Sequence, residues 1–87
     1  MSVLAVIFEK VNQDMDYSGL VDNIIEYNHV RLNKTSYLIQ SSSSPKQVYN
    51  ELRSFIASGD TLMVFELRKK WHGRGQNELV DWVSTRL

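Results

Sequence analysis

Length, composition and charge point to one small domain and exclude several classes of protein. The chain has 87 residues, of which 43% are hydrophobic and 23% charged, with one proline and no cysteine. This composition argues against disorder, and the lack of cysteine excludes disulfide frameworks and thiolate metal sites. The net charge of zero gives no sign of a generally basic nucleic-acid coat, and no apolar run is long enough to span a membrane. Without a secretory leader pattern, we expect a cytoplasmic protein with no membrane contact, folded as a single domain over residues 1–87.

The first two predicted elements are a buried strand and an amphipathic helix. Residues 3–11 form an apolar, β-branched run, which predicts a strand buried on both faces. Asp16 is a candidate N-cap for the helix that follows, and Asn28 is its expected end. The apolar stripe of this helix has helical spacing and comprises Tyr17, Leu20, Val21, Ile24 and Ile25.

A hairpin and a second helix are predicted next. Residues 29–32 and 36–40 are expected to form two short strands joined by a tight turn at Asn33-Lys34. Tyr37 and Ile39 then lie on one face of the second strand.

The second helix carries clear start and stop signals. Ser44 precedes Pro45 and lies three residues before Gln47, which is the pattern of a capping box. Its apolar stripe comprises Val48, Leu52, Phe55 and Ile56. Gly59 is expected to close this helix in the left-handed conformation.

A strand, a polar loop and a helix complete the chain. Residues 61–67 are apolar on both faces apart from Glu66, and the sequence "RKKWHGRG" that follows is typical of a loop. Asn77 is a candidate cap for a last helix, whose broad apolar face comprises Leu79, Val80, Trp82, Val83 and Leu87.

The order strand-helix-strand-strand-helix-strand-helix predicts an α+β fold, a ferredoxin-like βαββαβ sandwich with an additional carboxy-terminal helix. In that fold two crossover helices cover one face of the sheet. The first and last strands are nevertheless apolar on both faces, so the second face needs a cover. The carboxy-terminal helix or a second copy of the chain can supply it. We expect a homodimer in which the carboxy-terminal segment takes part.

Several stretches resemble one family. These are the pair Phe8-Glu9 at the end of the first strand, "DYSGLVDNI", "SYLIQSS", "ELRSFIASGDTLMVFEL" and then a Trp-x-Gly pattern. Together they resemble the SinR-like proteins, relatives of the small CRISPR-adaptation endoribonuclease-like subunit. The virulence-associated D toxins share that fold. The resemblance spans nearly the whole chain and implies a ferredoxin-like homodimer that packs sheet against sheet.

The resemblance also suggests a site at Glu9. In the adaptation relatives an Asp ends the first strand, and the two copies in a dimer can hold a divalent metal for phosphodiester cleavage. Glu9 takes that position here and is one methylene longer, which suits the strict geometry of Mg²⁺ poorly. The simpler interpretation is a solvated charge at a strand end. Asp14 and Asp16 lie just beyond and are candidates for a second carboxylate.

The one concentrated basic stretch offers a second site. It contains Arg68, Lys69, Lys70, Trp71, His72 and Arg74. Cations interleaved with an aromatic side chain can hold a phosphate backbone and stack a base. The alternative is a solvated loop in which Trp71 anchors the last helix. His72 is a candidate general base only if a phosphate lies beside it.

The sequence therefore favours a small homodimeric interaction protein or nucleic-acid-associated protein of the SinR-like group, without strong catalytic activity. No cofactor is expected in that case. One alternative is a metal-dependent ribonuclease or deoxyribonuclease that uses Mg²⁺ or Mn²⁺ on paired Glu9 side chains. Another is a module that binds a protein partner through a free sheet edge or the basic loop.

Overall fold

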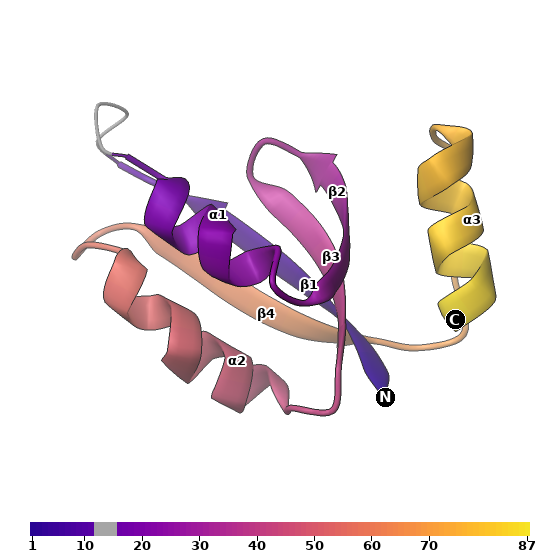
Figure 1. The fold of residues 1–87 in the computed structure, drawn as a ribbon, viewed down its shortest axis with the longest axis horizontal. Coiled ribbons are helices and arrows are strands. Elements are labelled where there is room, and N and C mark those ends of the chain that lie inside the picture. Colours follow the sequence, from indigo (N-terminus) through magenta and orange to yellow (C-terminus); the bar gives the residue numbers. More distant parts are fainter. Residues whose placement is uncertain (12–15) are drawn as a thin grey trace.

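The fold is an α+β arrangement of one four-stranded antiparallel sheet and three α-helices, seen in a computed structural model that describes residues 1–11 and 16–87 (Figure 1). The strands are β1 (Ser2–Glu9), β2 (Asn28–Asn33), β3 (Ser36–Ser41) and β4 (Thr61–Leu67). The helices are α1 (Ser18–Ile24), α2 (Pro45–Leu52) and α3 (Asn77–Arg86), with a 3₁₀ turn at Arg53–Phe55. In the described part of the chain, no helix combines the length and apolar composition needed to cross a membrane.

The strand order places β1 and β3 in the middle of the sheet. The order is β2-β3-β1-β4, so β2 and β4 form the two edges. This confirms the predicted α+β class and the central position of the first and third strands. The arrangement is compatible with a ferredoxin-like sandwich.

Helices α1 and α2 cover one face of the sheet and enclose the larger core. Leu4, Val6 and Phe8 of β1 are each no more than 1% exposed on this face. Their partners from the other elements are Leu20, Ile24, Tyr37, Ile39, Val48, Leu52 and Leu62. Tyr37 and Ile39 share this face, as predicted.

Helix α3 covers part of the opposite face. Figure 1 shows α3 on the other side of the sheet from α1 and α2. Val83 packs there in a second cluster with residues of three strands, namely Val3, Ala5, Val30 and Leu38. The indole N–H of Trp82 donates to Asn28 Oδ1 at 3.2 Å and helps to hold α3 beside β2.

The remainder of this second face carries exposed apolar side chains. Ile7, Met63 and Phe65 are 39%, 49% and 45% exposed. Ile7 lies opposite Met63 in the register of β1 and β4, and Phe65 lies opposite the buried Ala5. The three side chains are therefore neighbours on one face, and we call them the β1–β4 patch.

Two predicted helix signals are confirmed, although the second helix is shorter than predicted. Ser44 Oγ accepts from the Gln47 N–H, and Gln47 Oε1 accepts from the Ser44 N–H, which completes the capping box. The helix ends at Leu52 and passes into a 3₁₀ turn, so Phe55 and Ile56 pack on the core from outside the helix. Gly59 does adopt the left-handed conformation, at φ +88°, but in the turn before β4.

Three predicted boundaries at the first and last helices are wrong. Helix α1 begins at Ser18 and ends at Ile24, because the chain must turn to start β2 at Asn28. Asp16 still accepts hydrogen bonds from the Ser18 N–H and hydroxyl, so it serves the helix start from one residue outside the cap. Gln76, rather than Asn77, is the N-cap residue of α3, without a side-chain cap bond.

The first strand and the hairpin turn also differ from the prediction by one or two residues. Strand β1 ends at Glu9 rather than Val11, whose N–H donates to Asp60 Oδ1 instead of pairing in the sheet. The hairpin turn lies at Lys34-Thr35, because Asn33 Oδ1 accepts from the Thr35 N–H and fixes the turn one residue later.

Replacing Leu4 by Ala should lower the free energy of unfolding by about 2–5 kcal/mol, because it leaves a cavity between β1 and the two helices. The matched change Leu32→Ala should cost less than about 1 kcal/mol, since Leu32 is 42% exposed. Urea denaturation at one protein concentration measures both. Equal losses would contradict this description of the core.

Candidate functional site

Glu9 lies at the exposed end of β1. It pairs with Thr61 of β4, and its side chain is exposed. The next residue, Lys10, turns inward and is only 5% exposed. Lys10 Nζ donates to the backbone carbonyls of Asp16 and Phe55, at 3.3 Å each, and lies 5.1 Å from the centroid of the Tyr17 ring. Lys10 therefore ties the end of β1 to the elements around it and is held away from any ligand.

The nearest described carboxylates already accept hydrogen bonds from the chain. Asp60 accepts from the backbone N–H groups of Ala57 and Val11, at 2.7 and 3.0 Å, and these bonds lower the pKa of Asp60. The bonds from Ser18 likewise lower the pKa of Asp16. Asp14, the other candidate for a second carboxylate, lies outside the described residues.

A metal site at Glu9 is not assembled within one chain. Across residues 1–11 and 16–87, no group of three His, Asp or Glu side chains could hold a metal ion. A site of the kind that the resemblance implies needs Glu9 from two copies. It would hold a divalent ion that activates water for phosphodiester cleavage.

The basic stretch forms the exposed connection between β4 and α3, which we call the basic segment (residues 68–74). It has no regular secondary structure, and the side chains of Arg68, Lys69, Lys70, His72 and Arg74 are all exposed. Arg68 lies 3.7 Å from Glu66 in a solvated ion pair, which contributes little to stability. The cations of this segment are therefore open to an anionic partner.

Trp71 borders a depression that residues of α3 also line. It is 40% exposed and lines a shallow depression of about 170 Å³. Apolar side chains of β2 and α3 form most of the remaining wall, namely Leu32, Leu79, Val80 and Val83. Trp71 and α3 therefore border the same depression, and part of the indole surface is exposed for stacking.

Glu9 and the basic segment lie at opposite ends of the sheet. In the antiparallel pairing of β1 with β4, Glu9 lies opposite Thr61, whereas Val3 lies opposite Leu67, just before the segment. The six residue steps from Val3 to Glu9 along β1 span roughly 20 Å. The acid of the predicted nuclease site and the start of the basic segment are therefore not brought together in one chain.

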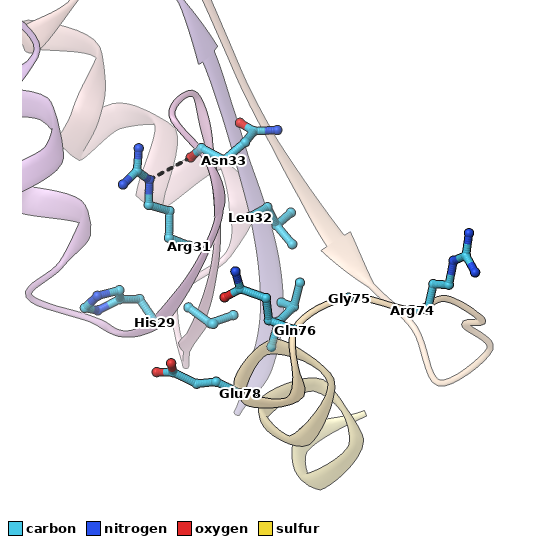
Figure 2. Close-up of a pocket in the computed structure, with 10 residues that line it drawn as sticks. His29, Arg31, Leu32, Asn33, Arg74, Gly75, Gln76 and Glu78 are labelled. Atoms are coloured by element: carbon cyan, nitrogen blue, oxygen red, sulfur yellow. Dashed lines mark hydrogen bonds between the residues drawn. The ribbon is translucent and has the colours of Figure 1, made fainter.

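A groove that the sequence did not reveal runs between β2 and the start of α3 (Figure 2). Its volume is about 710 Å³, and we call it the β2–α3 groove. Residues 29–33 form one wall and residues 74–79 most of the other. Its polar lining comprises His29, Arg31, Asn33, Arg74, Gln76 and Glu78. The two walls are more than forty positions apart in the sequence, and of the polar lining only Arg74 was a predicted site residue, as part of the basic stretch.

No protein-family model, curated protein or solved structure matches this chain. The resemblance to the SinR-like proteins therefore stays an expectation, and the class that the coordinates define is a small α+β domain with one antiparallel sheet.

Asp60→Asn should reduce the loss of folding stability that occurs when the pH is lowered from neutral to acid. Because hydrogen bonds from Ala57 and Val11 lower the pKa of Asp60, the ionised carboxylate stabilises the protein above its ordinary pKa. That contribution is lost as the pH falls through the lowered value. The variant should melt at a lower temperature near neutral pH and show a smaller further decrease from about pH 6 to about pH 2.

Melting temperatures measured across that range test this expectation, with Asp22→Asn on the exposed side of α1 as the control. If the melting temperature of Asp60→Asn decreases at acid pH as much as that of the wild type, these two hydrogen bonds do not contribute to stability.

Proposed function

We propose that this protein is a homodimeric interaction protein with a ferredoxin-like fold, in which two copies pair through the β1–β4 patch. The strand order β2-β3-β1-β4, with α1 and α2 on one face, supports the ferredoxin-like assignment. The observation that carries the dimer is the set of three large apolar side chains on β1 and β4 that α3 leaves exposed.

The patch has the properties of half of a symmetric interface. Each of its side chains is between about one third and one half exposed, and full burial of such a side chain contributes about 1.5–3 kcal/mol. A two-fold axis would place the same patch on both copies, so six half-exposed side chains would leave water together. The exposed Phe65 and Met63 are residue types enriched at protein interfaces.

Ile7→Glu combined with Phe65→Glu should convert the dimer into a folded monomer, because four carboxylates would be placed in the apolar contact. Sedimentation equilibrium gives the mass of each form. The matched control is Ile25→Glu combined with Tyr49→Glu, which changes two exposed apolar residues on the opposite side of the molecule and should leave the dimer intact. A wild-type monomer, or equal dissociation in the control, would refute the proposed interface.

Nucleic-acid association is a second candidate function, favoured by the basic segment. Its cations are exposed around the half-exposed Trp71, which is the combination that tracks a phosphate backbone and stacks a base. A dimer would present two such segments. Once one segment is bound to a long nucleic acid, the second segment is held at a high effective concentration beside the same molecule. The resemblance to the SinR-like group points the same way.

The triple change Lys69→Glu, Lys70→Glu and Arg74→Glu should abolish retardation of a labelled single-stranded oligonucleotide. Wild-type binding should weaken steeply as salt is raised, because phosphate contacts release counterions. The control reverses three exposed cations elsewhere, Lys34, Lys46 and Arg53, and so has the same net charge. Equal loss of oligonucleotide binding in both triple variants would indicate a net-charge effect. Undiminished binding in both would show that the basic segment does not bind nucleic acid.

Metal-dependent nuclease activity has less support than binding. The alternative requires Glu9 and the basic segment to act on one phosphodiester, yet they lie at opposite ends of the sheet within each chain. A dimer would have to place the Glu9 of each copy beside its counterpart. We therefore propose a binding function first.

A further inference from the structure

Strand β2 is an edge of the sheet that borders the β2–α3 groove. Among the described residues β2 has β3 as its neighbour on one side only, so its outer N–H and C=O groups have no strand partner. The register shifts between Arg31 and Asn33, which leaves Asn28 to Arg31 as the regular part of the edge. Residues 29–33 form the strand wall of the groove, a length of about 17 Å. An edge beside a groove of this size has room for one extended chain.

The two faces of β2 offer different side chains to such a chain. His29 and Arg31 lie on the face of α1 and α2, where the ring centroid of His29 is 6.1 Å from that of Tyr37. Val30 lies on the opposite face with α3. Figure 2 shows Arg31 and His29 on one side of the strand and Leu32 on the other, toward the segment that leads into α3. Leu79 adds an apolar wall on that second side.

The groove is more cationic than anionic. Arg31 Nε donates to the Asn33 carbonyl oxygen at 3.1 Å, which holds the guanidinium along the strand (Figure 2). Within the described residues, neither Arg31 nor Arg74 forms an ion pair with a carboxylate. Glu78 is the acidic residue of the lining and lies near the His29 end. A carboxylate presented beside Arg31 would therefore find an unpaired partner with a suitable geometry.

We propose that the β2–α3 groove binds an extended acidic peptide of a partner protein by strand addition to β2. The main chain of the peptide would bond to the free edge of β2. Because successive side chains of a strand point to opposite faces, acidic residues would meet Arg31 on one side, and apolar residues would meet Leu32 and Leu79 on the other. This inference does not depend on the proposed dimer, because β2 and β4 are opposite edges of the sheet.

The test is a titration of the ¹⁵N-labelled protein with a peptide of about eight residues that alternates Glu and Val. The expected result is a change in the amide signals of residues 28–33 and 74–79. A matched peptide with Lys in place of Glu should bind at least about tenfold more weakly. Arg31→Glu combined with Arg74→Glu should reduce binding of the acidic peptide by at least about tenfold. Lys46→Glu combined with Arg53→Glu, in and next to α2 and outside the lining of the groove, should change it less than about twofold.

Several results would overturn the proposal. These are unchanged amide signals at millimolar peptide, equal binding of the Lys peptide, or changes confined to the β1–β4 patch. If a thymidine oligonucleotide binds in the groove and the peptide does not, the ligand of the groove is nucleic acid and the peptide proposal is refuted. If the Glu variant does not give a folded spectrum, Arg31→Gln combined with Arg74→Gln tests the same contacts, and undiminished peptide binding in that variant would also refute the proposal.

Discussion

The central strand β1 is apolar on both faces, and the rest of the structure depends on covering it. Leu4, Val6 and Phe8 lie under α1 and α2, whereas Val3 and Ala5 lie under α3. Apolar surface gains free energy only when it leaves water, so a sheet with two apolar faces requires a cover on each. Helix α3 covers only part of the second face, and Ile7 of β1 with Met63 and Phe65 of β4 has no cover from within the described chain.

Two of the three surfaces considered for binding adjoin each other, because Arg74 belongs to both the basic segment and the lining of the β2–α3 groove. The β1–β4 patch lies on a face of the sheet and the β2–α3 groove lies along one edge, whereas the basic segment leads from the end of β4 to the groove. Polar groups that a catalytic site would need to combine are instead separated or already engaged, as Asp16 and Asp60 are. This distribution is the reason that a binding function is proposed before a catalytic one.

Local signals predicted much of the fold, and long-range contacts account for what they missed. The Ser44–Gln47 capping box and the alternation of Tyr37 and Ile39 depend on near neighbours, and both were found where predicted. The Gln76 cap of α3 was missed because no side chain marks it. The burial of Lys10 rests on the carbonyl oxygen of Phe55, which is 45 positions away. The groove likewise requires residues of β2 and of the α3 start to meet, and no spacing in the sequence predicts that.

Methionine oxidation tests the cover of the β1–β4 patch most directly. Met63 is 49% exposed in the single chain, and Met1, at 90% exposed, serves as the internal reference. Dilute peroxide followed by mass spectrometry gives the rate at each sulfur over a range of protein concentrations. We predict that Met63 is protected relative to Met1 at high concentration and loses this protection on dilution. A constant ratio of the two rates at every concentration would contradict the account.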